Sequence, residues 1–202
     1  IIVSNQAGRS NIISRLEQYG VKIDSNDNKV QKILNEVKDR EFSGYSYDGA
    51  DASFELLANR LLGKIPEYLK VKSYDVNVSK FENLKTKASV VFIIDGKEIE
   101  CHGEGNGPVN ALDNAIRSNF KKVEKYYNYF SDLKLLDYKV RILNTGTEAT
   151  TRVLIESTDK TGKSWFTVGV SPNIIEASFK ALIDSLDYKL YKEKAPANLN
   201  EK

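Results

Sequence analysis

The first third of the chain alternates apolar and polar positions with a helical period. Residues 25–42 are the clearest case, because their apolar residues fall on one stripe behind a start rich in capping residues. These apolar residues are Val30, Ile33, Leu34 and Val37. Two neighbouring stretches repeat the period and end before a glycine, as helices commonly do. The pattern therefore predicts three helices, over residues 11–19, 25–42 and 51–62.

From residue 72 the period changes to two, which is typical of strands. Three alternating stretches follow, "YDVNVSKF", "ASVVFIID" and "KEIECHGEG". The tripeptide Asp95-Gly96-Lys97 between the last two predicts a tight hairpin turn. Helical spacing returns over residues 108–123, so this part of the chain is predicted to form a βββα unit.

The same unit follows a second time. Strands are predicted over residues 138–144, 150–158 and 164–170, and a helix from Ser171 onward. A single constant shift of the sequence along itself superposes the two copies. It places Tyr74 on Tyr138, Gly105 on Gly169 and Pro108 on Pro172.

A duplicated βββα unit favours an α+β fold with pseudo-two-fold symmetry, in which each helix covers a sheet. Two copies are too few for a solenoid. The predicted organisation is a helical part over residues 1–65, a βββα-βββα domain over 66–192 and a disordered polar tail over 193–202.

Composition narrows the classes of function without choosing one. The 30 basic and 28 acidic residues leave a net charge of +2, so charge indicates neither nucleic acid nor an anionic membrane as a partner. Cys101 is the single cysteine, so the chain cannot form an internal disulfide, which favours a cytoplasmic protein. Together with the single histidine, His102, it supplies too few ligands for a zinc site. No apolar run approaches the roughly 18 residues of a membrane span. Because the chain starts at Ile1 and contains no methionine, we expect it to be part of a longer protein.

The stretch "GEGNGP", residues 103–108, is the main candidate for a ligand-binding segment. Glycines before a helix can aim backbone N–H groups at an anion. A phosphate loop, however, needs a lysine where Pro108 and Val109 stand, and the dinucleotide fingerprint needs a glycine inside the helix. A plain strand-to-helix turn explains Pro108 in the first helical turn. His102 with Glu104 has the residue types of a general base and its orienting partner, although a lone histidine at a strand end is more typical of scaffolding.

Double-stranded RNA binding is a second alternative, because such modules end in a helix after three strands. They hold phosphates with lysines at the start of that helix. In this chain the two helix starts carry Asp113 and Glu176 instead, which disfavours nucleic acid.

Two separated motifs carry a resemblance to a known family. "HGEGNGPVNALDNAI" in the first copy and "WFTVGVSPNIIEASFKALIDSLDYKL" in the second resemble the carboxy-terminal regulatory domain of the α-isopropylmalate synthase and citramalate synthase family, over residues 72–190. Upstream, "VSNQAGRSNI" and "YSYDGADASFELLANRLLGK" resemble the helical linker subdomains of that family, and the second is most similar to the citramalate synthase branch.

The resemblance implies a parent acyltransferase that condenses acetyl-CoA with a 2-oxo acid, which is pyruvate for citramalate synthase. The family places this chemistry and a divalent metal in an amino-terminal TIM barrel. No such barrel is present in this sequence. The resemblance therefore implies no catalytic residue, metal or cofactor in this chain, and no catalysis by the chain alone.

The resemblance also implies a homodimer that binds a branched-chain amino acid near the dimer interface, isoleucine for citramalate synthases or leucine for isopropylmalate synthases. Glycines 103, 105 and 107 allow close backbone approach, and the helix start at Pro108 offers N–H groups to a carboxylate. Asn110 is expected to contact the amino group, and Val109, Ile142 and Ile174 to contact the side chain. The second copy has two glycines fewer, so the two helix starts need not bind equally. The candidate effector-binding residues are Gly105, Asn106, Gly107, Pro108, Val109, Asn110, Tyr138, Ile142, Pro172 and Ile174.

Overall fold

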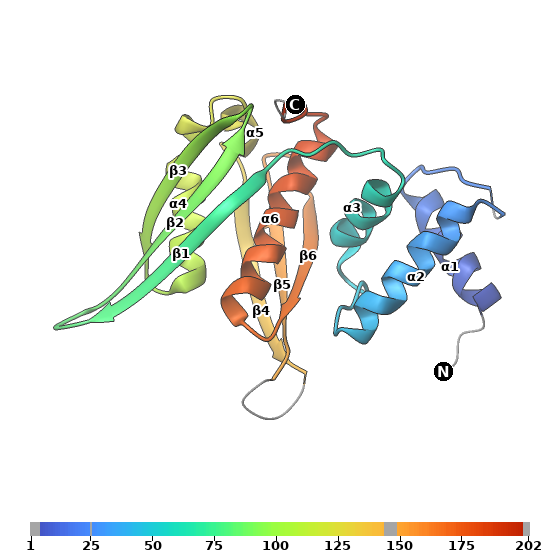
Figure 1. The fold of residues 1–202 in the computed structure, drawn as a ribbon, viewed down its shortest axis with the longest axis horizontal. Helices are drawn as coiled ribbons and strands as arrows, with labels where there is room; N and C mark the ends of the chain where they lie inside the picture. Colours follow the sequence, from blue (N-terminus) through green and yellow to red (C-terminus); the bar gives the residue numbers. More distant parts are fainter. Residues whose placement is uncertain (1–4, 25, 144–148, 200–202) are drawn as a thin grey trace.

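The computed structural model describes residues 5–24, 26–143 and 149–199 (Figure 1). Three helices come first, as predicted: α1 (Asn5–Gln18), α2 (Asn28–Phe42) and α3 (Asp51–Leu61). Helix α1 begins six residues before the predicted start at residue 11. The first βββα unit follows, with β1 (Lys70–Lys80), β2 (Leu84–Ile94), β3 (Lys97–Gly105) and α4 (Pro108–Ser118). A 3-10 turn, η1 (Phe120–Lys122), and α5 (Tyr127–Phe130) lead to the second unit, made of β4 (Lys134–Ile142), β5 (Thr151–Thr158), β6 (Ser164–Ser171) and α6 (Ile174–Lys192).

The two units form separate antiparallel sheets, in the orders β1-β2-β3 and β4-β5-β6. In Figure 1, α4 lies behind the first sheet, whereas α6 lies in front of the second. The two helices also contact each other. This inverted order of layers is what a two-fold axis between the units produces, and the predicted α+β fold with a duplicated βββα unit is confirmed.

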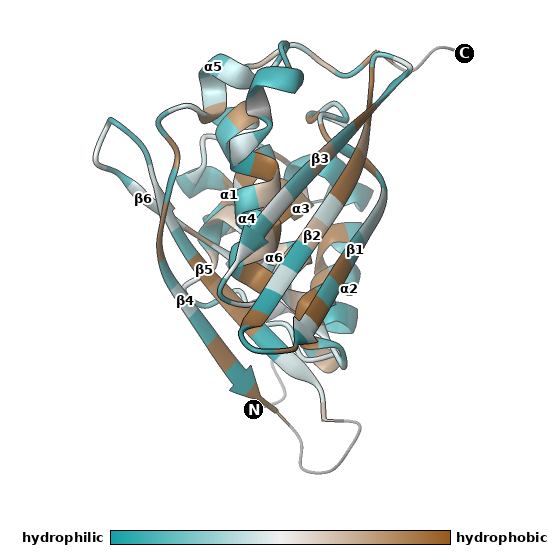
Figure 2. Ribbon diagram, turned by 90° about the vertical axis from the view of Figure 1, so that its left-hand side faces the viewer, coloured by the Kyte–Doolittle hydropathy of each residue, from teal (hydrophilic) through white to brown (hydrophobic). Residues whose placement is uncertain are grey.

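Each sheet buries the face that its own helix covers. In β2 the buried residues alternate as Ala88, Val90, Phe92 and Ile94, so that one face packs on α4 and the other is more exposed. Figure 2 shows apolar and polar residues alternating along β1, whereas the second half of β2 is apolar throughout. The hairpin between β2 and β3 turns at Asp95 and Gly96, which both have positive φ, as the sequence predicted.

The helical part shares a core with the second unit. The predicted stripe of α2 is buried together with Phe54 of α3 and with Val168 and Val170 of β6. The N-cap of α2 is Asp27, whose side chain accepts a hydrogen bond from the N–H of Lys29 at 2.8 Å. Because β6 supplies part of this core, the helices are positioned directly by the second βββα unit.

The structural repeat departs from the single constant shift that the sequence predicted. The first strands of the two copies obey it, because β1 and β4 carry a register shift at matching positions, Val71/Ser73 and Leu135/Asp137. The third strands do not, since Ala88 pairs with Gly103 whereas Val153 pairs with Gly169. The connections between strands are longer in the second copy, and they add the extra residues. Gly169 therefore corresponds to Gly103 rather than Gly105, and the N-caps Gly107 and Asn173 are related by the same longer shift.

The prediction of a disordered tail is wrong for residues 193–199. Asn198 is buried, and its side chain donates to Ile93 O and accepts from Asp95 N, both at 2.8 Å. The hydroxyl of Tyr126 donates to Pro196 O at 3.0 Å. The tail thus satisfies backbone groups at the β2–β3 hairpin that would otherwise lack partners, which its polar composition did not reveal. The last three residues of the predicted tail lie outside the described residues.

Candidate functional site

We call residues 105–110 the glycine turn, which joins β3 to α4. Asn110 Oδ1 closes it by accepting hydrogen bonds from Asn106 N at 3.1 Å and from Asn114 Nδ2 at 3.5 Å. Asn114 Nδ2 also donates to Glu104 O at 2.8 Å. The oxygen of Asn110 therefore stabilises the turn itself, a role that the sequence prediction of an effector contact did not include.

Of the glycines at positions 103, 105 and 107, the first two are needed because α4 packs closely against β3. A Cβ at Gly103 would lie 2.2 Å from Ala115 N, and one at Gly105 would lie 2.6 Å from Ala111 N. Gly107 differs, because a Cβ there would meet nothing within 4 Å. Helix α4 thus approaches β3 at backbone distance, and only the glycine next to Pro108 faces open space.

The two helix starts are capped differently. Helix α6 begins after Asn173, whose side chain accepts from Ile175 N at 2.8 Å and Glu176 N at 3.2 Å. Helix α4 begins after Gly107, which has no side chain to do so. The first N–H groups of α4 are therefore open to an external acceptor, whereas those of α6 are satisfied within the chain.

The candidates from the second copy lie on β4 and at the start of α6. The Tyr138 hydroxyl is 2.7 Å from Ser178 Oγ of α6. Ile142 and Ile174 are 67% and 46% exposed, and Pro172 is exposed before the N-cap. In Figure 1 the starts of α4 and α6 and the end of β4 lie at the same, lower end of the domain. No hydrogen bond among the described residues joins the glycine turn to this second group.

Thr86 is a site residue that sequence reasoning missed. It lies on the helix-facing side of β2, paired with Gly105 of the glycine turn. Its side chain is buried, and its hydroxyl has no hydrogen-bond partner within the described chain. A lone polar position in the apolar alternation of β2 was the available signal. The residue therefore adds an unpaired donor and acceptor beside the open start of α4.

The family follows from a profile match. The profile described as the LeuA allosteric (dimerisation) domain matches residues 48–190, which include α3, the first βββα unit and the second unit except for the last two residues of α6. This chain belongs to the LeuA allosteric (dimerisation) domain family.

Curated relatives extend the similarity of this LeuA-family chain beyond the profile. An (R)-citramalate synthase of Geobacter sulfurreducens is 46% identical over 197 residues, covering 95% of this chain and 37% of that protein. An (R)-citramalate synthase of Aquifex aeolicus is 44% identical over 198 residues, covering 96% and 37%. A 2-isopropylmalate synthase of Burkholderia pseudomallei is 31% identical over 199 residues, covering 95% and 35%. The chain thus spans little more than a third of the length of these relatives.

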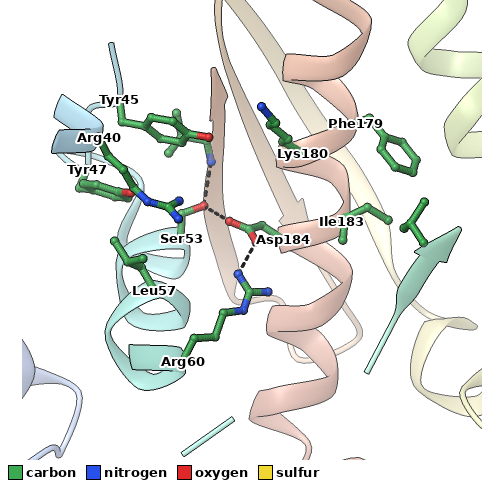
Figure 3. A pocket seen from close by; sticks show the side chains of 12 residues that line it. Arg40, Tyr45, Tyr47, Ser53, Leu57, Arg60, Phe179, Lys180, Ile183 and Asp184 are labelled. Atoms are coloured by element: carbon green, nitrogen blue, oxygen red, sulfur yellow. Dashed lines mark hydrogen bonds and ion pairs between the residues drawn. The ribbon is translucent and has the colours of Figure 1, made fainter. Parts of the chain in front are cut away.

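A set of polar contacts joins α3 of this LeuA-family chain to α6 (Figure 3). Ser53 of α3 accepts a hydrogen bond from Val168 N of β6 at 3.0 Å and donates to Asp184 of α6 at 2.9 Å. Arg60 then donates to Asp184 at 2.9 Å and to Asp187 at 2.7 Å. Through these contacts α3 is joined both to the edge strand β6 and to α6.

The stability of the chain is expected to depend on pH through Asp187. Burial raises the pKa of Asp187 from 3.8 to about 7, despite the ion pair with Arg60. At a pH between these two pKa values, Asp187 is protonated in the folded chain and ionised in the unfolded chain. The stabilisation that the protonated Asp187 side chain gives to the fold is therefore complete below about pH 4 and is lost as the pH rises through 7. We therefore expect Asp187→Asn to gain stability relative to wild type across this window, by as much as a few kcal/mol. Urea denaturation at several pH values measures it, and an opposite slope would show that the Arg60 pair dominates.

The single cysteine and the single histidine both lie on β3, away from the glycine turn. Cys101 is fully buried on β3, where burial raises the pKa of its thiol. His102 lies on the opposite face of β3, with Nε2 3.5 Å from Glu100. Within the described ranges no cluster of three or more His, Cys, Asp or Glu side chains is arranged to hold a metal ion. Within the same ranges, no helix has the length and apolar character needed to cross a membrane.

Proposed function

We propose that this chain is the feedback-regulatory and dimerisation region of a citramalate synthase, and that it binds isoleucine as an inhibitor. The parent is proposed to be a cytoplasmic acyltransferase that condenses acetyl-CoA with pyruvate for isoleucine synthesis. Identities of 46% and 44% to citramalate synthases, against 31% to a 2-isopropylmalate synthase, support this branch. The alternative is the same region of a 2-isopropylmalate synthase, with leucine as the effector.

The divalent metal and acetyl-CoA of the proposed reaction are assigned to a catalytic barrel elsewhere in the parent. The His, Cys, Asp and Glu side chains of the described residues do not group as metal ligands. We expect this chain alone not to catalyse the condensation.

The start of α4 is the observation that supports effector binding most directly. Its first N–H groups have no side-chain cap from Gly107, and a helix start attracts a carboxylate through these groups and the helix dipole. The unpaired hydroxyl of Thr86 lies beside it. An α-amino acid has the carboxylate and ammonium groups that this pair of features can bind. Because Asn173 caps α6, we propose that the first copy binds the effector and that the second contributes packing.

Exposed apolar residues at the same end support an aliphatic effector side chain and a dimer. Ile142 and Ile174 are exposed there, and Val109 is half-buried at the start of α4. On β4, Leu136 and Val140 are also 54% and 40% exposed, and such exposed apolar residues are typical of a surface that another protein covers. We propose that a second copy of the chain covers this strand.

Calorimetric titration with isoleucine, leucine and valine tests the proposal. We expect saturable binding of isoleucine, and of leucine only if the chain belongs to the isopropylmalate branch. Asn110→Ala removes the acceptor that closes the glycine turn and is expected to weaken isoleucine binding by about tenfold while the dimer persists. Phe42→Ala, at a 96% exposed position of α2, is the matched control. Absence of binding to all three amino acids would contradict effector sensing.

A further inference from the structure

Two adjacent rows of cross-strand partners form the end of the second sheet, and they face opposite sides. The row on the helix-facing side lies at the proposed effector end and consists of Ile142, Thr151 and Ser171. In the neighbouring row Arg152 pairs with Val170 on the other face, where Val170 shares a core with α2 and α3. The effector end and the helical part are therefore separated here by a single layer of sheet backbone.

Helix α2 ends against this part of the sheet. Gly44 follows the helix with φ +106°, and its N–H donates to Glu41 O at 3.0 Å. The N–H of Tyr45 donates to Arg40 O at 2.9 Å, which completes the glycine-ended cap known as the Schellman motif. A Cβ at Gly44 would lie 2.7 Å from Cδ1 of Leu143, the residue that follows β4. The end of α2 thus has a defined backbone shape that is seated directly on the sheet.

Arg152 of β5 holds this helix end. Its Nε donates to the carbonyl oxygen of Gly44 at 2.7 Å. The carboxyl end of a helix carries partial negative charge, so a guanidinium placed there makes a charge-assisted hydrogen bond and interacts favourably with the helix dipole. Burial and the nearby Arg141 lower the pKa of Arg152, and no carboxylate of the described residues pairs with it. The end of α2 is therefore the electrostatic partner of Arg152.

The end of β6 contacts the start of α6 as well as the end of α2. The Ser171 hydroxyl donates to the carboxylate of Glu176 and accepts a hydrogen bond from the N–H of Asn173 at 3.0 Å. The preceding residue, Val170, faces the other way, and its Cγ1 would lie 3.3 Å from a Cβ at Gly44. The start of α6 and the end of α2 are thus linked through two successive residues of β6.

We propose that this sheet end couples isoleucine binding to the position of α2, an inference that rests on the function proposed above. The sheet end consists of Ile142, Leu143, Thr151, Arg152, Val170 and Ser171. In the closed state, which the structure describes, Arg152 holds Gly44, and in a released state this hydrogen bond is broken. Isoleucine packed on Ile142 and the start of α6 orders one face of the sheet end, and so favours the closed state, whose contact lies on the other face. Arg152 is then a positioning residue that carries feedback to the helical part without touching the effector.

Three substitutions in the 202-residue chain isolate this contact. Arg152→Met keeps the length of the side chain up to the position of Nε but has no donor. Arg152→Gln keeps an N–H donor at the same number of bonds from the backbone and removes the charge. Arg141→Met removes the neighbouring guanidinium of β4, which has no hydrogen bond to α2 within the described residues, and is the matched control.

Amide hydrogen exchange of Gly44 and Tyr45, measured by NMR with and without saturating isoleucine, reports the state of this helix end. In wild type we expect isoleucine to slow this exchange by about fivefold, the effect of one hydrogen bond. Arg152→Met should exchange about fivefold faster without isoleucine and should lose the slowing, because the contact that carries it is absent. Arg152→Gln should retain part of the slowing, and Arg141→Met should match wild type. A purely structural role of Arg152 would raise the exchange rate without removing the response to isoleucine.

Calorimetric titration of the same variants separates this coupling from effector binding itself. Because coupling is reciprocal, Arg152→Met should still bind isoleucine, with a dissociation constant raised by no more than the factor by which isoleucine slows exchange in wild type. Isoleucine binding to wild type with unchanged exchange at Gly44 and Tyr45, or an undiminished response in Arg152→Met, would overturn the coupling and leave the proposed function standing. Absence of isoleucine binding to wild type would reject both. The wild-type comparison decides the coupling even if Arg152→Met does not fold.

Discussion

Gly169→Ala is expected to destabilise the chain by about 3 kcal/mol or more, the upper end of the range for overpacking. A Cβ at this position of β6 would lie 2.0 Å from the carbonyl oxygen of Ala177 and 2.9 Å from Ala181 N. Both atoms belong to the backbone of α6, so no side-chain rotation relieves the clash. The helix would have to move away from the sheet, which opens the core around Leu182 and Leu186.

Urea denaturation measures this effect against a matched control. Gly107→Ala adds the same methyl group at a glycine with extended backbone, φ −165°, where nothing lies within 4 Å. We expect it to change stability by no more than about 0.5 kcal/mol. Gly103→Ala should resemble Gly169→Ala, because Gly103 is its structural counterpart. A wild-type denaturation midpoint for Gly169→Ala would show that this close contact is not needed for the fold.

Val140→Asp is expected to raise the dissociation constant of the proposed homodimer by about 100-fold or more, because it places an unpaired charge in an apolar interface. Val140 lies on the helix-facing side of β4, paired with Val153, and is 40% exposed in the single chain. Ile142, the next residue on the same face, and Leu136, earlier in β4, are also exposed. Sedimentation equilibrium measures the change, and isoleucine titration of the same variant shows whether effector binding needs the dimer.

The neighbouring residue supplies the control for this variant. Arg141→Asp introduces the same charged side chain on the opposite face of β4. We expect it to leave the dimer intact. If Arg141→Asp dissociates the dimer and Val140→Asp does not, the outer face of the second sheet is the interface and the proposed arrangement is wrong.

Local patterns predicted the elements because their causes are local. The stripe of α2 is buried as its period required, and the turn at Asp95 and Gly96 forms because those residues tolerate positive φ. The duplication was also visible, since both copies repeat the same order of periods. Its alignment was wrong at the helix starts, because loop lengths can change without leaving a mark on strand or helix periodicity.

The candidate site was predicted only in outline. The sequence indicated that residues 105–110 start a helix, but glycines that accommodate a ligand and glycines that accommodate a helix look the same in a sequence. The structure separates them, because Cβ atoms at 103 and 105 would meet α4 whereas one at 107 meets nothing within 4 Å. Thr86 was missed since its importance depends on its pairing with Gly105 across the sheet.

The sequence by itself determined the order of the main helices and strands, the duplicated βββα unit and the family, because periodicity, turn chemistry and motifs act over a few neighbouring residues. Only the tertiary structure decided which helix start is open, how the tail is held and where α3 meets α6. Those features depend on contacts such as Asn198 with Ile93 and Ser53 with Asp184, which join residues far apart in the sequence. Such contacts are selected by packing of the whole chain, and no local pattern encodes them.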